Sequence, residues 1–73
     1  MREHEWSPCE LYHAYQDARE EAECALSDWS AAPLSDRRDA FAVYRAAADR
    51  EDAAGIAWLE ACRAYDAAQH LAA

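Results

Sequence analysis

The fold of this chain depends on residues 36–71, DRRDAFAVYRAAADREDAAGIAWLEACRAYDAAQHL. Side chains that suit a packed interface recur there at alternating steps of three and four residues, which is typical of one face of an α-helix. The positions on this face are Phe41, Tyr44, Ala48, Glu51, Gly55, Trp58, Cys62, Tyr65 and Gln69. The phase of the pattern never shifts, so we predict one long helix over about residues 36–71.

An alternative architecture breaks this helix near residues 49–55. The polar cluster Asp49-Arg50-Glu51-Asp52 is followed there by Gly55, and glycine is common at the tip of a turn. A turn would normally reset the apolar phase, which does not happen here. The alternative is a compact three-helix bundle.

The start of an earlier helix is marked by Trp6-Ser7-Pro8-Cys9-Glu10-Leu11. Ser7 is a good N-cap, Pro8 suits the first helical position, and Glu10 completes a capping box with Ser7. Trp6 and Leu11 are placed to form a hydrophobic staple across this cap. We therefore predict that a helix begins at Pro8.

The first helix continues to about residue 30. Its apolar stripe consists of Leu11, Tyr15, Ala18, Ala22, Ala25 and Trp29, widened by Tyr12 and Leu26. Pro33 ends it and leaves Ser35 or Asp36 as the next N-cap. The prediction is a single all-α domain over residues 1–73, an antiparallel helical hairpin with helices at about 8–30 and 36–71.

Self-association is the expected source of further stability. A chain of 73 residues has a single core that supplies only about 3–5 kcal/mol. Its cysteines are odd in number and follow no secretory signal, so we expect reduced thiols in the cytoplasm rather than disulfides. The second helix is predicted to be longer than the first, and the end that extends past the first helix is apolar. We predict a homodimer that closes a four-helix bundle, with a self-association or partner surface formed by Ile56, Trp58, Leu59, Cys62 and Tyr65.

The strongest compositional signal is a formal charge of -8. Binding to a phosphate backbone depends on Lys and Arg, so direct nucleic-acid binding is not expected. No apolar run approaches the length of a membrane span. The acidic face of the first helix comprises Asp17, Glu20, Glu21 and Asp28. An alternative function is therefore an acidic inhibitor or nucleic-acid mimic that blocks a basic nucleic-acid-binding protein.

Two sets of residues with the same spacing suggest metal binding or thiol chemistry. Cys9, His13 and Asp17 lie four residues apart on the first helix, and Cys62, Asp66 and His70 repeat the types and spacing on the second. Neither set supplies a fourth ligand, which structural zinc sites need. A metal-binding or thiol-redox helper remains an alternative. We predict no cofactor and no catalysis, but a small acidic helical module for protein–protein interaction.

Overall fold

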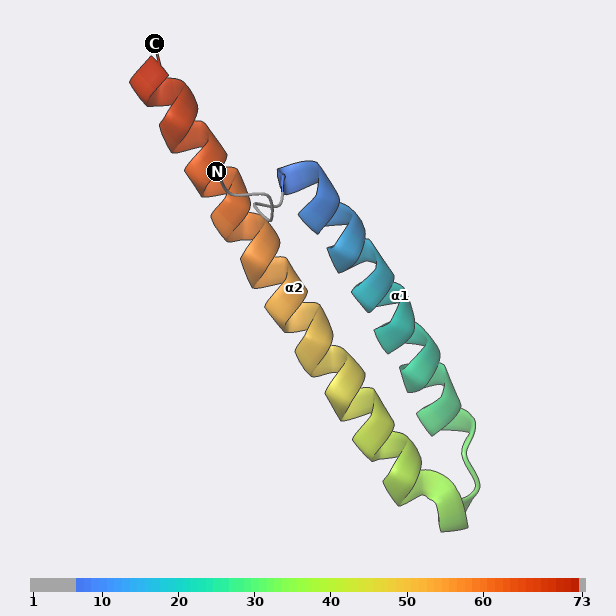
Figure 1. Ribbon diagram of the computed structural model, residues 1–73. Helices are drawn as coiled ribbons and strands as arrows, with labels where there is room; N and C mark the ends of the chain where they lie inside the picture. Colours follow the sequence, from blue (N-terminus) through green and yellow to red (C-terminus); the bar gives the residue numbers. More distant parts are fainter. Residues whose placement is uncertain (1–6, 73) are drawn as a thin grey trace.

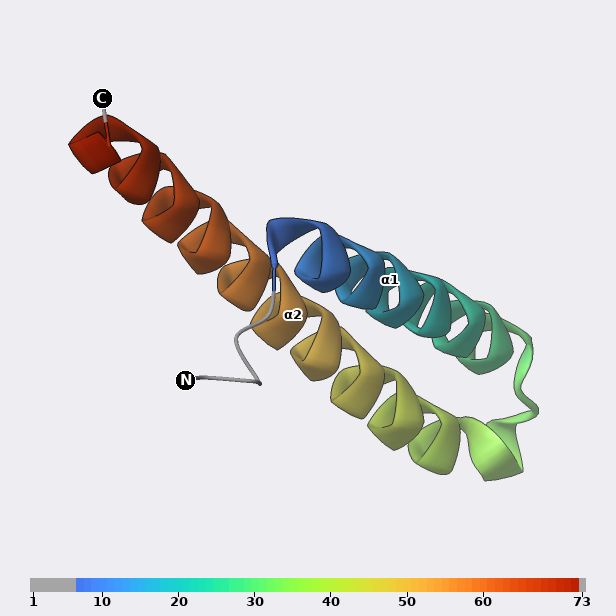
Figure 2. The same ribbon diagram turned by 45° about the horizontal axis from the view of Figure 1, so that its top comes forward.

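The computed structural model describes residues 7–72 and shows a helical hairpin. Helix α1 spans Pro8–Ala31, a 3-10 turn η1 spans Leu34–Asp36, and helix α2 spans Arg37–Ala72. The two helices lie antiparallel and side by side in both views, and α2 extends well past the start of α1 (Figures 1 and 2). No strand occurs within residues 7–72. The predicted all-α hairpin with a long second helix is confirmed.

The N-terminus of α1 is held by the predicted capping box. The Glu10 backbone N–H donates to Ser7 Oγ at 3.2 Å, and the Ser7 N–H donates to Glu10 Oε1 at 2.9 Å. Pro8 occupies the first helical turn, where its missing N–H costs nothing. The predicted start at Pro8 is confirmed, while Trp6, the other half of the expected staple, lies outside the described residues.

The connection between the helices is short, with Ala32 and Pro33 extended and η1 following directly. The Ala32 N–H donates to the Trp29 carbonyl at 3.2 Å, and the Asp36 N–H donates to the Pro33 carbonyl at 2.9 Å. Ser35 and Asp36, which the sequence offered as N-caps for the second helix, lie inside η1 instead. The reason is that η1 runs directly into Arg37, so the chain enters α2 from a helical turn rather than from an extended cap.

Helix α2 is continuous through residues 49–55. It has 36 residues, which corresponds to roughly 54 Å, and the long axis of the molecule measures 59 Å. Gly55 lies within the helix and has no positive φ angle. The three-helix alternative, with a break near residues 49–55, is therefore wrong.

The core between the helices is made of alanine. Ala22, Ala25 and Ala47 are the buried residues among residues 7–71, with Tyr44 packed against them. Small side chains let two helix backbones approach closely, but they remove little apolar area from water. Every member of the predicted α1 stripe from Leu11 to Trp29 is at least half-buried.

Aromatic clusters close the hairpin at both ends of this alanine core. Near the loop, the Trp29 ring stacks on Tyr44 at a centroid distance of 5.6 Å and meets Phe41 at 4.8 Å. Beyond the alanine contact, these large rings fill the space between the two helices that small side chains would leave open.

The second aromatic cluster lies near the start of α1, at the open end of the hairpin. There, Trp58 stacks on Tyr15 at 5.7 Å and meets Tyr12 at 4.9 Å. No loop joins the helices at this end, so the ring contacts hold them together.

The last turns of α2 have no helix beside them. All residues from Arg63 to Leu71 are exposed, so Tyr65 and Gln69, which the sequence placed on the packed face, contact no core. The radius of gyration is 16.8 Å, compared with about 11 Å for a compact domain of this length. A rod of this shape buries little of its own surface.

Candidate interaction surfaces

The apolar surface predicted on α2 is divided by the structure into exposed and packed members. Ile56, Leu59 and Tyr65 are 58%, 49% and 55% exposed. Trp58 and Cys62 are half-buried, and Trp58 belongs to the aromatic cluster with Tyr12 and Tyr15 described above. Ile56, Leu59 and Tyr65 are therefore the members available to a partner, whereas Trp58 acts first within the hairpin.

A small apolar pocket lies beside Leu59. Tyr15, Gly55, Trp58 and Leu59 line about 290 Å³ of open space, and their surfaces there are mainly carbon. A Cβ atom on Gly55 would lie 3.4 Å from Cε1 and 3.5 Å from Cδ1 of Tyr15. The missing side chain thus lets the Tyr15 ring lie against the α2 backbone and leaves a hollow next to it.

Other exposed apolar side chains extend this surface beyond the residues predicted from sequence. Tyr12, Leu26 and Phe41 are 38%, 41% and 38% exposed. At 3.6 residues per turn, Tyr12 and Leu26 flank the packed stripe of α1, and the contact of Tyr12 with Trp58 puts it at the same end as the pocket. The sequence predicted all three on packed faces. Tyr12 and Phe41 do pack on Trp58 and Trp29, but the narrow core leaves part of each ring, and of Leu26, exposed.

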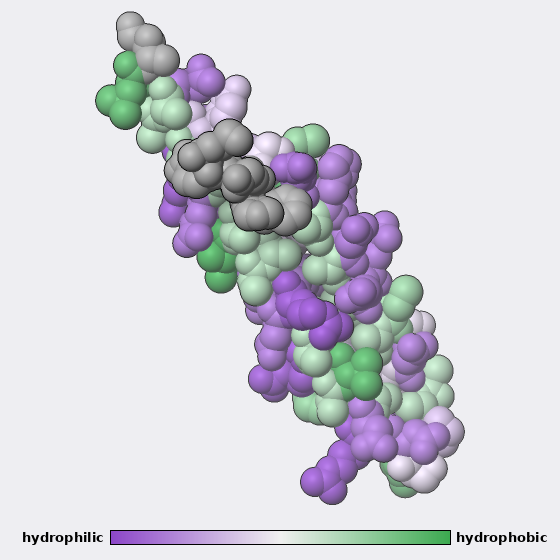
Figure 3. All heavy atoms as spheres, viewed as in Figure 1, coloured by the Kyte–Doolittle hydropathy of each residue, from purple (hydrophilic) through white to green (hydrophobic). Residues whose placement is uncertain are grey.

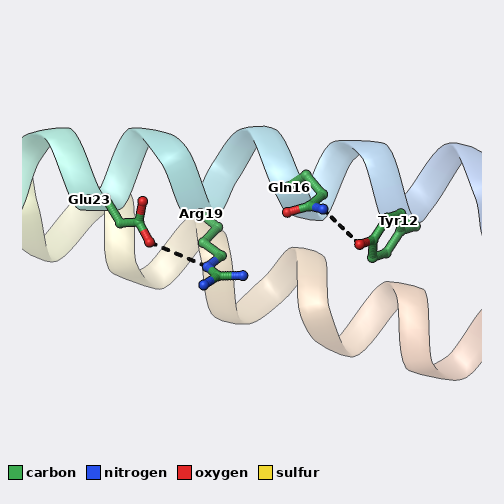
Figure 4. Close-up of polar contacts among 4 residues, drawn as sticks. All are labelled: Tyr12, Gln16, Arg19 and Glu23. Carbon is green, nitrogen blue, oxygen red and sulfur yellow. Dashed lines mark hydrogen bonds and ion pairs between the residues drawn. The ribbon is translucent and has the colours of Figure 1, made fainter.

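Charge and apolar side chains are interspersed on the molecular surface. Figure 3 shows patches of hydrophobic residues interrupted by hydrophilic ones along the whole rod. On α1, Gln16 Nε2 donates to the Tyr12 hydroxyl at 2.7 Å, and Arg19 Nε lies 3.4 Å from Glu23 Oε2 (Figure 4). The hydrogen bond orients the phenol of Tyr12, whose ring covers Trp58.

The four predicted acidic residues lie along one groove between the helices. Asp17, Glu20, Glu21 and Asp28 line an open hollow of about 630 Å³, together with Cys24, Ala25, Val43, Ala47 and Arg50. The sequence predicted these carboxylates as an acidic face on the outer side of the first helix. They flank the helix contact instead, because the narrow alanine core leaves room for them beside it.

Arg50 is the cation of this acidic groove. Its Nη2 lies 3.4 Å from Glu21 Oε1, and both side chains are largely exposed. Such an exposed pair contributes about 0–1 kcal/mol. Four carboxylates and one guanidinium give the groove a formal charge of -3, and its floor includes the exposed side chain of Val43.

The two Cys/His/Asp sets are not gathered into a metal site. Within residues 7–72, no group of three or more His, Cys, Asp or Glu side chains is arranged to hold an ion. The His70 Nδ1 atom lies 3.3 Å from the Asp66 carbonyl oxygen instead. Cys9 is exposed and Cys62 is half-buried. The described part of the chain thus brings neither set together as the ligands of a metal ion.

None of the helices described is both long and apolar enough to cross a membrane. Comparison with protein-family models, curated proteins and solved structures finds no match to this chain.

Proposed function

We propose that this chain is a small protein–protein interaction module that works as a homodimer and has no catalytic activity of its own. The observation that carries the proposal is the contrast between its core and its surface. The buried residues described are three alanines, while Ile56, Leu59 and Tyr65 on α2 remain about half exposed. A hairpin built this way gains most by covering these side chains with another protein.

The energetic argument uses the exposed part of each side chain. Complete burial of a Leu or Ile side chain contributes about 1.5–3 kcal/mol. Leu59 and Ile56 are half exposed, so covering each would contribute about 1 kcal/mol per subunit. Two-fold symmetry doubles every such contribution. For a chain whose single core supplies only about 3–5 kcal/mol, these contributions are decisive.

The first test is the solution mass by light scattering, with circular dichroism over a dilution series. We expect a mass near twice 8.2 kDa and a helical signal that falls on dilution, because folding and association are coupled. A fully helical monomer at micromolar concentration would refute the homodimer.

A substitution separates self-association from folding. Leu59→Asp puts a carboxylate on the exposed surface of α2 and leaves the ring contacts of Trp58 in place, so we expect a monomeric or partly unfolded chain. Leu34→Asp is the matched control, since Leu34 is 88% exposed on η1, away from α2's apolar surface. Equal dimer content in both variants would exclude Leu59 from the interface.

A second candidate function rests on the acidic groove. We infer that its carboxylates bind a basic protein, in the manner of an inhibitor that takes the place of nucleic acid. The support is that four carboxylates lie within about three turns of α1 along a single groove, a spacing comparable with the phosphates of a strand.

Charge reversal at the groove tests this second candidate. A triple variant, Asp17→Arg, Glu20→Arg and Asp28→Arg, should lose binding to a polyarginine peptide while keeping its helicity. Binding by the unaltered chain should weaken steeply with salt, as expected for charge pairing in water. Salt-independent binding, or binding unaffected by the reversal, would refute the proposal. Control substitutions at Arg19 and Glu23, on the flank of α1 opposite the acidic groove, should have little effect on binding of the peptide.

A further inference from the structure

A second row of side chains runs along α2, about a quarter-turn around the helix from the row that faces α1. It is spaced by three, four and seven residues, as on one face of a helix. Its principal members are Arg45, Asp52, Gly55, Leu59, Arg63 and Asp66, of which Gly55 lies between this row and the row that faces α1. We refer to these six residues as the second row.

The second row is accessible along its length. Its four charged members and Leu59 are exposed, and Gly55 is half-buried at the apolar pocket that Leu59 also lines. The ion pairs found within residues 7–72 are Arg19–Glu23 and Arg50–Glu21, so neither of them uses the second row. The row thus combines an apolar centre with charged flanks.

The order of charges along the row has a symmetry of its own. Positive Arg45 and negative Asp52 precede the apolar centre, and positive Arg63 and negative Asp66 follow it. Read backwards, each positive position becomes negative and each negative position becomes positive. A second copy laid antiparallel therefore presents opposite charges at every flank, whereas a parallel copy presents like charges.

The residue pairs that would meet in an antiparallel dimer have nearly the same midpoint along α2. Arg45 and Asp66 are centred between residues 55 and 56, and Asp52 and Arg63 between residues 57 and 58. Gly55 and Leu59 are centred on residue 57. These centres lie within about half a helical turn of one another, so a single two-fold axis satisfies all three pairs.

We propose that two copies of this chain pair antiparallel through the second rows of their α2 helices, about a two-fold axis near residues 56–57. Arg45 and Asp52 of each copy then meet Asp66 and Arg63 of the other. Leu59 of each copy enters the hollow beside Gly55 of its partner. This inference rests on the proposed homodimer and specifies its interface and orientation.

The proposed pairing also explains the length of α2. With the axis near residues 56–57, residues 63–72 of one copy lie beside residues 41–50 of the other. The exposed last turns of α2 thus gain a neighbouring helix that their own chain does not supply. The second row lies about a quarter-turn from α1, which is the angle between neighbours in a square four-helix bundle.

The acidic groove is a poorer surface for a second copy. Its formal charge of -3 would face an identical charge across a two-fold axis, and like charges in apposition oppose association. The four charged members of the second row sum to zero. Self-association through the second row leaves the acidic groove open on another side of the hairpin.

The first test uses charge exchange and light scattering over a dilution series. Arg63→Glu sets two carboxylates against each other in both symmetry-related contacts, so the dimer dissociation constant should rise roughly tenfold to a hundredfold. Adding Asp52→Arg restores opposite charges in the antiparallel dimer and should return the constant to within about threefold of the original. Arg50→Glu, with the same charge change at the acidic groove instead of the second row, should have little effect on the dissociation constant.

The second test determines the orientation by disulfide mapping. Cys9, Cys24 and Cys62 are replaced by Ala, and Arg63→Cys is introduced with or without Asp52→Cys. In the antiparallel pair the two copies of position 63 are separated by about 20 Å along the helices, beyond disulfide reach. Arg63→Cys alone should therefore form no cross-link, whereas the variant that also carries Asp52→Cys should yield a disulfide between positions 52 and 63 of different copies.

The outcomes separate this inference from the proposed function. A chain that is monomeric at tens of micromolar would refute the homodimer itself, and the antiparallel pairing with it. A chain that is dimeric but cross-links through position 63 alone, or is insensitive to Arg63→Glu, would retain the homodimer and refute the antiparallel second-row interface. Restoration by the double substitution would not occur in a parallel pair, because position 52 would face position 52.

Discussion

Removing the Trp58 side chain should open the hairpin at the end where no loop joins the helices. Its ring meets Tyr12 at 4.9 Å and stacks on Tyr15 at 5.7 Å. Trp58→Ala removes both ring contacts at once. At the other end, Trp29 keeps its own partners, and the short connection still holds α1 and α2 together.

The magnitude follows from burial and ring geometry. Trp→Ala in a core costs about 3–5 kcal/mol, and a single aromatic pair contributes about 0.5–1.5 kcal/mol beyond its area. Because Trp58 is half-buried, we take the lower limit of about 3 kcal/mol for the loss in free energy of unfolding. That is most of the stability that one small core supplies, about 3–5 kcal/mol.

The assay is urea unfolding followed by circular dichroism, at one fixed protein concentration so that association does not change the comparison. Trp58→Phe is the control, since it keeps a ring between the tyrosines and should cost about 1 kcal/mol. Hydrogen exchange should accelerate first at the start of α1. A loss below about 1 kcal/mol for Trp58→Ala would refute the idea that this cluster closes the hairpin.

Three smaller effects should accompany this one. Ser7→Ala removes the cap of α1 and should lower the free energy of unfolding by about 1 kcal/mol, measured by the same urea titration. Gly55→Ala should raise the helicity of the isolated chain and contribute up to about 1 kcal/mol, because its Cβ would only touch the Tyr15 ring; a loss of stability would show that the ring cannot shift. Arg50→Ala breaks the pair with Glu21 and should cost less than about 1 kcal/mol, a difference that added salt should remove.

The local signals in the sequence were sufficient for the fold. The capping box at Ser7 and Glu10 is set by neighbouring residues, so it could be predicted without knowledge of the tertiary structure. The continuity of α2 followed from its unbroken apolar phase, which outweighed the presence of Gly55. The entry into α2 was predicted less well, because a 3-10 turn and an extended cap use similar residues near Ser35 and Asp36.

The interaction surfaces were harder to predict because they depend on how far the helices cover each other. Trp58 and Leu59 are adjacent in the sequence and similar in hydrophobicity, yet one ring packs inside the hairpin and the other side chain remains half exposed. Helical periodicity gives the direction of a side chain around its helix. It does not give how much of that helix's surface the neighbouring helix covers. The placement of Asp17 and Glu21 beside the groove likewise depends on how much of α1 the neighbouring helix covers.

Alanine connects the fold of this chain with the proposed homodimer. The contact of Ala22 and Ala25 with Ala47 brings the two helices close together, and alanine also favours the helical conformation of each segment. The same small side chains bury little apolar area for a chain of 73 residues. Larger apolar groups such as Leu59 cannot enter so narrow a contact, and they are left on the flanks. A second copy can cover them without widening the alanine core, so close packing within one hairpin favours association between two.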